Sequence, residues 1–397
     1  MGLHDTPRSE RLHIGIFGKV NSGKSTFLNM MTDQQSSLVS KEAGTTTDPV
    51  YKAMELINIG PVVFIDTAGF EDNTTLGEQR LEKTKESAVK SDIAIILFDG
   101  KEETSSFSWL TYFKERKTPV LLIINTYTQK EQQDLQTKIS SEDVLSLCID
   151  VKDAMYRNEV IEALLRLLPE QNRQESLTGN LVKTEDVVLL VMPQDLQAPK
   201  GRLILPQVQT IRELLDKQCI VMSCTTQNLS TSLASLKQSP NLIICDSQVF
   251  EEVYRLKPKE SKLTSFSILL AGYKGDIQTF IEGAKAIETL NKHSHVLIAE
   301  ACTHAPVSED IGRVKIPMML KKKYGQELKV SIVSGVDFPK DLTPYDLIIH
   351  CGGCMFNRKY VLARIEMAKQ AKVPITNYGI CIAYIKGILD KIDVFAH

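Results

Sequence analysis

The stretch Gly18-Lys19-Val20-Asn21-Ser22-Gly23-Lys24-Ser25 decides the fold of the chain that contains it. It fits the pattern G-x-x-x-x-G-K-[ST], with the apolar run LHIGIF before it and the helix-like run KSTFLNMM after it. Glycines between a strand and a helix allow backbone N–H groups to converge on phosphate oxygens at the helix N-terminus. The stretch therefore predicts a P-loop in an α/β nucleotide-binding domain, with phosphate-binding residues Gly18, Asn21, Ser22, Gly23, Lys24, Ser25 and Thr26.

Two segments downstream extend this site to the γ-phosphate and a metal ion. The apolar run VVFI leads into Asp66-Thr67-Ala68-Gly69, so we expect Asp66 to hold a Mg²⁺-bound water and the Gly69 N–H to meet the γ-phosphate. Between the P-loop and this run lies a threonine series, of which Thr46 is our candidate second Mg²⁺ ligand. The predicted catalytic set is Lys24, Thr46, Asp66 and Gly69, and the predicted Mg²⁺ ligands are Ser25 and Thr46.

The segment that would read the base departs from the usual pattern. Strand VLLII is expected to end in N-K-x-D, whose aspartate accepts hydrogen bonds from guanine, but here it ends in Asn125-Thr126-Tyr127-Thr128. Asn125 remains, whereas the lysine and the discriminating aspartate are absent. A site that has lost this acceptor is expected to discriminate less well between GTP and ATP or ITP. The nearest candidate for the later backbone-donor motif is Ser146-Leu147-Cys148.

Composition and hydrophobic patterning outline the rest of the chain. The 397 residues are too many for one ordinary core, and the formal charge of −2 argues against a protein that coats nucleic acid or anionic membrane. Apolar runs alternate with helical patterns, which predicts α/β domains with mainly parallel sheets. The longest apolar runs are strand-sized, and the start of the chain has no signal-peptide pattern, so we expect a cytoplasmic protein.

Two polar stretches divide this pattern into three sections. PEQNRQESLTGN begins at Pro169, and RLKPKESK covers residues 255–262. The third section is expected to open with a strand at 266–271. The predicted domains are a P-loop GTPase domain over 1–170 and two α/β domains over 181–260 and 263–397.

Cysteines and histidines gather in the third section. Cys302 follows the apolar run VLIAEA as part of C-x-H with His304, and His350-Cys351-Gly352-Gly353-Cys354 follows the apolar run DLII. Neighbouring strand ends of a parallel sheet share one crevice, so the two halves can converge there. Cys302, Cys351 and Cys354 with a histidine suit either tetrahedral zinc or a 4Fe–4S cluster, and the spacing does not separate the two. The cysteines as merely buried thiols, and His304 and His350 as donors to sulfur rather than ligands, are the alternatives.

The nucleotide motifs, in their order, resemble the translation-factor-related GTPases, especially the branch of the tRNA-modification GTPase. That branch carries an asparagine inside the P-loop, here Asn21, which helps to coordinate K⁺. The resemblance implies K⁺-stimulated hydrolysis. Phe70 follows D-T-A-G where a water-orienting glutamine could stand, and a phenyl ring cannot orient water, so slow intrinsic turnover is expected.

A broader resemblance covers essentially the whole chain in order. The P-loop domain followed by VMPQDLQAPKGRLILPQVQTIRELLD (191–216), YKGD (273–276), EACTH (300–304), DIGRVKIP (310–317) and HCGGCM (350–355) is similar to the HydF family of FeFe-hydrogenase maturation GTPases. The resemblance implies a GTP- and Mg²⁺-binding homodimer that holds a 4Fe–4S cluster on Cys302, Cys351 and Cys354. It also implies that the middle domain is a dimerisation domain and the last one a cluster-binding domain. His304 and His350 fall on motif positions whose ligand role varies.

The family's role would make the chain a scaffold or carrier. Its cargo is a diiron precursor made with two radical-SAM maturases and delivered to apo FeFe-hydrogenase, with no membrane or nucleic acid involved. The sequence departs from the family at Ala305, where a second histidine is expected, and at Gly272, where arginine usually precedes YKGD. The rival reading is an RNA- or ribosome-associated GTPase with a structural zinc site. A cluster-containing enzyme is a third, although the chain has no C-x-x-x-C-x-x-C run.

Overall fold

The computed structural model describes residues 7–32, 49–56, 58–67, 75–98, 104–125, 144–168, 176–193, 203–301 and 310–394. Backbone contacts divide the chain into two compact units, Met1–Gln174 and Glu175–His397. The division falls inside the polar stretch that begins at Pro169. The two units are described separately below.

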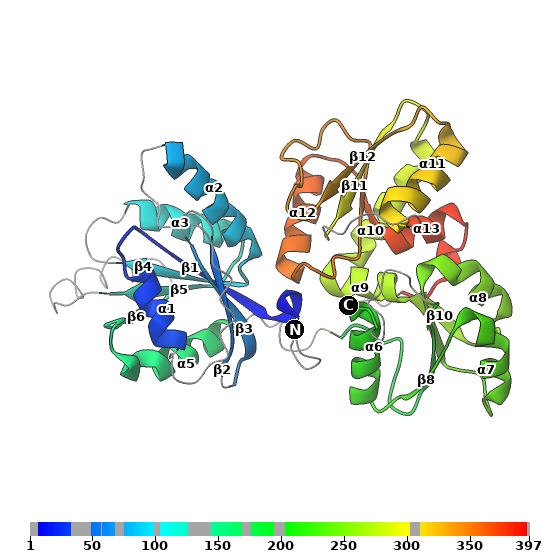
Figure 1. Cartoon of the computed structure of the whole chain (residues 1–397), viewed down its shortest axis with the longest axis horizontal. Helices are drawn as coiled ribbons and strands as arrows, with labels where there is room; N and C mark the ends of the chain where they lie inside the picture. The colour runs from blue at the N-terminus through cyan, green and yellow to red at the C-terminus, as the bar shows by residue number, and fades with distance from the viewer. Residues whose placement is uncertain are drawn as a thin grey trace. The chain divides into compact units, whose positions relative to one another are not determined.

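The first unit is built on a six-stranded sheet in the order β2-β3-β1-β4-β5-β6 (Figure 1). Strands β1 and β3 to β6 are parallel, as expected for strands joined through helices, and β2 lies antiparallel to β3 at the edge. The strands are β1 (Leu12–Gly18), β2 (Val50–Leu56), β3 (Gly60–Asp66), β4 (Ile93–Phe98), β5 (Val120–Ile124) and β6 (Leu145–Cys148).

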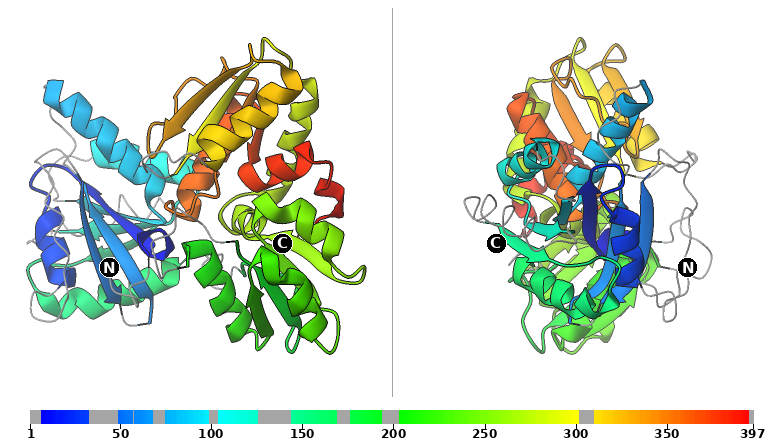
Figure 2. Two further views of the ribbon diagram at one scale, coloured as in Figure 1. Left: turned by 45° about the vertical axis from the view of Figure 1, so that its right-hand side comes forward. Right: turned by 90° about the vertical axis from the view of Figure 1, so that its left-hand side faces the viewer.

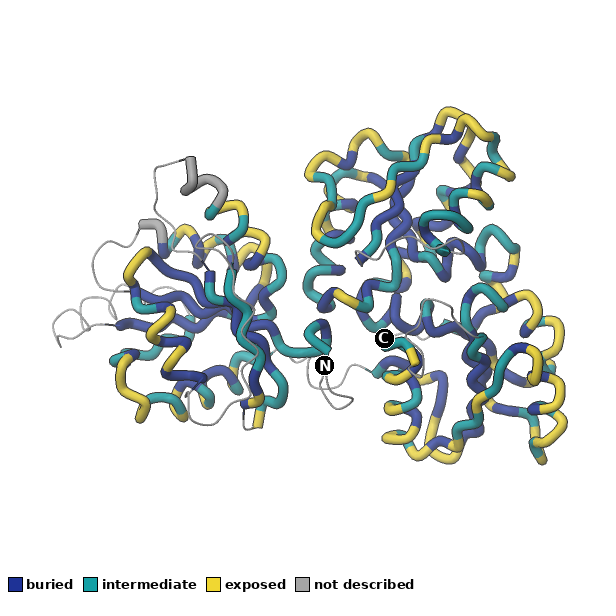
Figure 3. The backbone as a smooth tube through the Cα atoms, in the orientation of Figure 1, coloured by how far each residue is buried: buried dark blue, intermediate teal, exposed yellow. Residues whose placement is uncertain are grey.

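Helices cover both faces of this sheet. α1 (Lys24–Thr32) and α5 (Arg157–Leu167) pack on one face, and α2 (Thr75–Lys90) and α3 (Thr104–Glu115) pack on the other. Strands β4 and β5 are buried throughout, which explains their unbroken apolar sequences (Figure 3). This two-sided burial holds the carboxyl edge of β1, β3 and β5 in place as the floor of the nucleotide site.

The second unit contains two four-stranded sheets, each wholly parallel. Their strand orders are β10-β9-β7-β8 and β12-β11-β13-β14. The first sheet comprises β7 (Val187–Val191), β8 (Ile220–Cys224), β9 (Leu242–Cys245) and β10 (Lys262–Ser265), and the second comprises β11 (His295–Glu300), β12 (Lys329–Ser334), β13 (Leu347–His350) and β14 (Ile375–Asn377).

The two sheets share a hydrophobic core. One cluster of buried side chains runs from Val191 and Ile243 through Ile268 to Ile298 and Ile348. Ile268 belongs to α9, which follows β10 and is seen between the two sheets in Figures 1 and 2. The helices of this unit are α6 (Leu205–Asp216), α7 (Leu229–Ser235), α8 (Phe250–Leu256), α9 (Phe266–Lys274), α10 (Ile277–Ala284), α11 (Ile316–Tyr324), α12 (Arg358–Gln370) and α13 (Tyr378–Ile385).

One predicted element was wrong. Residues 266–271, expected as a strand, form the start of α9, because the Ser265 hydroxyl accepts a hydrogen bond from the Ile268 N–H (3.2 Å) and caps the helix. Almost every side chain of α9 is buried, so the sequence lacks the polar face that marks a helix. A short, fully apolar run cannot be assigned by periodicity alone.

The predicted fold class is confirmed: the chain is α/β, with a P-loop between β1 and α1 of the first sheet and two further parallel sheets after it. Among the described residues, no helix is both long enough and apolar enough to cross a bilayer.

Candidate functional site

The P-loop lies between the end of β1 at Gly18 and the start of α1 at Lys24. The Lys24 ammonium is buried and donates hydrogen bonds to the carbonyls of Gly18 (3.0 Å) and Lys19 (2.6 Å). Burial lowers the pKa of Lys24 to about 8, against the opposing effect of Asp66. Ser25 and Thr26 are exposed in the first turn of α1, where free N–H groups favour an anion.

One of the two predicted Mg²⁺ ligands, Ser25, lies against Asp66 next to the P-loop. The Ser25 hydroxyl donates a hydrogen bond to one Asp66 carboxylate oxygen (3.1 Å), although the two residues belong to α1 and the end of β3. The other Asp66 oxygen is buried and has no hydrogen-bond partner. Burial raises the pKa of Asp66, and Ser25, Lys24 and Lys52 oppose the rise. A hydroxyl beside a carboxylate oxygen without a partner is a donor set that suits Mg²⁺.

Asn125 ties the base-reading edge of the sheet to the P-loop. Its side-chain amide donates to the Ser22 carbonyl (3.2 Å), and its side-chain oxygen accepts from the Val151 N–H (3.4 Å). The loop after β6 therefore reaches the site through Val151. Ser146-Leu147-Cys148, the sequence candidate for the backbone-donor motif, lies within β6 itself, and its role toward the base stays a prediction. The sequence held one signal for the position of the loop after β6: the largely apolar run that begins at Leu145 ends at Asp150, immediately before Val151.

Several predicted nucleotide-site residues lie outside the described parts of the chain. These are Thr46, Gly69, Phe70 and the segment Thr126-Tyr127-Thr128. The structure brings together Gly18, Ser22, Lys24, Ser25, Asp66 and Asn125. Asn21 lies in the same loop with a left-handed backbone conformation (φ 66°).

The second candidate site lies at the carboxyl edge of the sheet that contains β11 and β13. These strands are neighbours, with Ala299 opposite His350, so the residues that follow them are adjacent. The Cys351 sulfur accepts hydrogen bonds from the N–H groups of Ala301 (3.0 Å) and Gly353 (3.4 Å). Gly353 has a left-handed backbone (φ 67°), which directs its N–H back to the sulfur.

The ionisation of Cys351 reflects its burial. Burial raises the pKa of Cys351 to about 11, and the nearby Cys354 adds to the rise. The N–H groups of Gly353 and Ala301 and the charge of Arg364 act in the opposite direction. Without a metal, Cys351 is a thiol at neutral pH, so metal binding would have to release its proton.

His350 is held inside the protein by both ring nitrogens. Nδ1 lies 2.7 Å from the Cys351 carbonyl and Nε2 lies 3.2 Å from the Arg364 guanidinium. The residue is 1% exposed, and burial lowers the pKa of His350 to about 3, helped by the charge of Arg364. As arranged here, His350 has no free ring nitrogen for an iron atom, and this geometry favours the supporting role over ligation.

The remaining members of the constellation are only partly described. Cys354 packs against the core residues under the first sheet of the second unit, which include Leu269 and Leu270. Cys302 and His304, with Ala305, lie outside the described residues. Among the residues that are described, no group of three His, Cys, Asp or Glu side chains is arranged to hold a metal ion.

The described half of the site nevertheless fits an iron–sulfur cluster. Backbone N–H groups aimed at a cysteine sulfur, a glycine turn and a buried cation are features that stabilise cluster-bound thiolates. Ala301, whose N–H contacts the Cys351 sulfur, is the residue immediately before Cys302.

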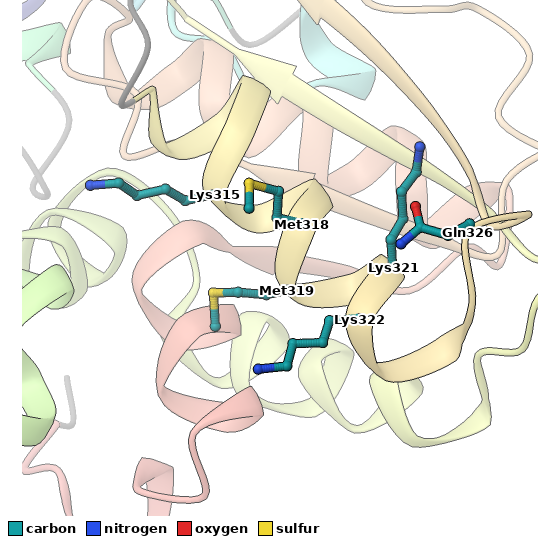
Figure 4. A pocket seen from close by; sticks show the side chains of 6 residues that line it. All are labelled: Lys315, Met318, Met319, Lys321, Lys322 and Gln326. Atoms are coloured by element: carbon teal, nitrogen blue, oxygen red, sulfur yellow. The ribbon is translucent and has the colours of Figure 1, made fainter.

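A separate hollow of about 470 Å³ follows the surface of α11 (Figure 4). Methionine and lysine side chains line it, with Met318 64% exposed. None of its residues belongs to either candidate site. They are Lys315, Met318, Met319, Lys321, Lys322 and Gln326.

Comparison with known families covers five strands of the first sheet and both sheets of the second unit. Residues 13–126 match the family described as "50S ribosome-binding GTPase". Residues 177–275 match "Hydrogen maturase F dimerization domain", and residues 278–393 match "Hydrogen maturase F tetramerization domain". The last two together span more than half of the chain.

Individual relatives match the GTPase region. GTPase Der of Mycoplasmopsis pulmonis is 35% identical over 133 residues, which cover 32% of this chain and 30% of that protein. The tRNA modification GTPase MnmE of Brachyspira hyodysenteriae is 28% identical over 173 residues, which cover 41% of this chain and 36% of that protein. The chain thus spans about a third of the length of these relatives. A solved structure of Era from Aquifex aeolicus aligns with a TM-score of 0.33 at 18% identity, over 63% of this chain and 98% of that one.

The resemblance drawn from the sequence motifs is therefore confirmed by matches that run in the same order along the chain. The P-loop unit is related to Der and MnmE, and the second unit matches two domains that are both described for hydrogen maturase F. This chain belongs to the hydrogen maturase F family.

Proposed function

We propose that this chain is a GTP-binding scaffold for assembly of the FeFe-hydrogenase cofactor. It holds a 4Fe–4S cluster on Cys302, Cys351 and Cys354 and carries a diiron precursor, which it delivers to apo FeFe-hydrogenase. Membership of the hydrogen maturase F family supports a role of this chain in hydrogenase maturation. An open or exchangeable position on the cluster suits a carrier, because a precursor must bind and later leave.

The observation that carries the proposal is the environment of the Cys351 sulfur. Two backbone N–H groups, from Ala301 and Gly353, already point at it. One of these donors is the residue before Cys302, on the neighbouring strand end. The cluster supplies an iron site to which the precursor attaches. The protein's own task is to hold the thiolates, exclude water from Cys351 and keep one coordination position available.

GTP acts in this proposal as a switch on partner binding or release. Lys24 neutralises the β- and γ-phosphates, Ser25 and Thr46 hold Mg²⁺, Asp66 orients a metal-bound water, and the Gly69 N–H meets the γ-phosphate. Asn21 would take part in binding K⁺. Turnover is slow, because Phe70 cannot orient the attacking water, and the chemistry remains separate from the cluster.

A homodimer is proposed on the basis of an exposed apolar face in the second unit. Val208 and Leu215 lie two helical turns apart on α6 and are both exposed. Ile220, on the edge strand β8, is 59% exposed. Exposed apolar side chains beside a free sheet edge are typical of an interface. The proposed partners are a second copy, two radical-SAM maturases and apo FeFe-hydrogenase, all in the cytoplasm.

Anaerobic purification with iron and acid-labile sulfide analysis, followed by EPR of the reduced protein, tests this function. We expect about four irons and four sulfides per chain, and loss of the signal in a variant with Cys351→Ser and Cys354→Ser. Stoichiometric zinc with no iron after anaerobic reconstitution would overturn the proposal. It would favour instead an RNA- or ribosome-associated GTPase with a structural zinc site.

A further inference from the structure

A buried cation lies directly behind the cysteine turn. Arg364, on α12, is 2% exposed, and its guanidinium lies 4.7 Å from the ring of Phe338, 4.5 Å from that of Phe356 and 4.8 Å from that of Tyr360. It also donates a hydrogen bond to the Gly335 carbonyl. Aromatic faces and a carbonyl hold the charge in a fixed position.

Within the described part of the chain, no acidic side chain neutralises the charge of Arg364. In the described ranges, no carboxylate forms an ion pair with Arg364, and its Nε is buried without a hydrogen-bond partner. An arginine stays charged at any physiological pH, and burying such a charge without an anion is costly. A negative charge placed close to Arg364 would therefore stabilise this buried guanidinium.

The contact between Arg364 and His350 links this charge to the cysteine turn. Arginine can only donate, so His350 Nε2 must accept across the 3.2 Å contact, which places the ring proton on Nδ1. That Nδ1–H then donates to the Cys351 carbonyl, 2.7 Å away. A chain of contacts thus runs from Arg364 through His350 to the backbone of Cys351.

We propose that Arg364 is the positioning residue and fixed counter-charge of the cysteine turn. It sets the tautomer and orientation of His350, which in turn holds the Cys351 carbonyl, and its positive charge faces the anionic thiolates and cluster. This inference rests on the proposed function, since a bound thiolate cluster would supply the anion that the described residues do not give Arg364. A buried cation close to a cluster stabilises its reduced state and raises its reduction potential.

The experiment compares two substitutions of Arg364 with a control on the same helix, all in the full chain. Arg364→Met removes the charge and keeps much of the apolar stem, whereas Arg364→Lys keeps the charge. Lys369→Met removes an exposed cation of α12, which pairs with Asp276 at 3.2 Å. The readouts are iron per chain after anaerobic reconstitution, the rate of iron loss to a chelator, and the midpoint potential from an EPR-monitored redox titration.

We expect Arg364→Met to hold iron about 10- to 100-fold less tightly and to shift the midpoint potential to more negative values. Arg364→Lys should keep a midpoint close to that of the wild type but lose iron faster, and Lys369→Met should match the wild type. Wild-type loading and midpoint in a folded Arg364→Met variant would overturn the inference alone. If Arg364→Met does not fold, wild-type iron loss in Arg364→Lys would overturn the positioning role. Absence of iron and sulfide from the wild type would overturn the proposed function itself.

Discussion

The amide of Asn125 and the carbonyl of Ser22 are hydrogen-bonded at 3.2 Å across 103 positions of sequence. The bond joins the end of β5 to the P-loop, while the Asn125 oxygen accepts from Val151 in the loop after β6. One side chain therefore fixes the relative positions of the phosphate-binding loop and two loops on the base-binding side. Both bonds are buried, so their loss cannot be compensated by water.

Asn125→Asp is expected to weaken nucleotide binding by about 5- to 150-fold, corresponding to about 1 to 3 kcal/mol. The carboxylate keeps the acceptor for Val151 but replaces the donor to Ser22 with a repelling oxygen. Titration with a fluorescent GDP analogue measures the effect. Asn29→Ala, which removes an exposed bond with Lys52 in the same unit, serves as control and should leave affinity unchanged. Equal affinities in the two variants would contradict the prediction.

Base selectivity should respond to restoring the absent motif. With Thr126→Lys and Thr128→Asp together, the chain regains N-K-x-D, and we expect its preference for GTP over ATP to increase by at least about tenfold. A competition assay with labelled GDP against GTP, ITP and ATP measures the preference. The single substitution Thr126→Lys restores the residue that stacks on the base but not the aspartate that accepts from guanine. It should therefore change the preference for GTP over ATP only slightly. Sharp discrimination in the wild type would show that other residues read the base.

Potassium should accelerate GTP hydrolysis. Asn21 occupies the P-loop position that contributes to K⁺ binding in the resembled GTPases, and its left-handed backbone keeps it within the loop. Phosphate release is measured at constant ionic strength in KCl and in NaCl. We expect several-fold faster release in KCl, and no difference between the salts for Asn21→Ala. Identical rates for the wild type in both salts would refute this role of Asn21.

Gly353 and Gly387 form a matched pair for testing the cysteine turn. Both have φ 67°, so alanine at either position costs about 1 to 2 kcal/mol of backbone strain. A Cβ at Gly353 would also lie 3.1 Å from Val361, whereas at Gly387 nothing lies within 4 Å. We expect both variants to unfold at lower denaturant concentration but only Gly353→Ala to lose iron after reconstitution. Full iron loading of Gly353→Ala would show that the turn tolerates distortion.

Acid should weaken the second unit through Glu213. Burial acts to raise the pKa of Glu213, but hydrogen bonds from Thr178, Ser176 and Leu177 outweigh it and leave the pKa below its ordinary value of 4.5. The ionised carboxylate of Glu213 therefore stabilises the fold at pH values above the ordinary pKa of 4.5. This contribution to the free energy of unfolding is lost as the pH falls through the lowered pKa of the folded state.

Urea unfolding of the full chain at pH 7 and at pH 4 measures this contribution. Glu213→Gln should lower the free energy of unfolding by about 1 to 2 kcal/mol at pH 7 and should reduce the difference between the two pH values. Glu252→Gln, on the exposed side of α8, should leave both values near those of the wild type. If Glu213→Gln shows the same difference in free energy of unfolding between pH 7 and pH 4 as the wild type, other groups cause the acid sensitivity.

The sequence predicted those helices and strands whose formation depends mainly on neighbouring residues. The P-loop motif carries its own strand and helix, so β1 and α1 were within reach of the sequence. The neighbouring positions of β11 and β13 followed from the apolar runs that precede the cysteines. The antiparallel edge strand β2 and the short strands β6, β10 and β14 carried weaker signals and were not predicted.

The features beyond prediction depend on packing between distant segments. Nothing in the sequence near residue 350 indicates that a guanidinium from α12 contacts His350, because this contact requires the helix to pack against β13. The helical state of α9 depends on burial on all sides. The involvement of Val151 follows from how β6 pairs with β5, which fixes where its loop begins.

The core shared by the two sheets of the second unit limits how this protein can be divided, whether in evolution or in the laboratory. The two family matches meet between residues 275 and 278, just after α9, yet Ile268 of that helix packs into the same cluster as Ile243 and Ile298. A fragment cut at this junction would expose apolar surface from both halves to water. Residues 177–275 and residues 278–393 are therefore expected to fold and to be degraded together, as one cooperative body.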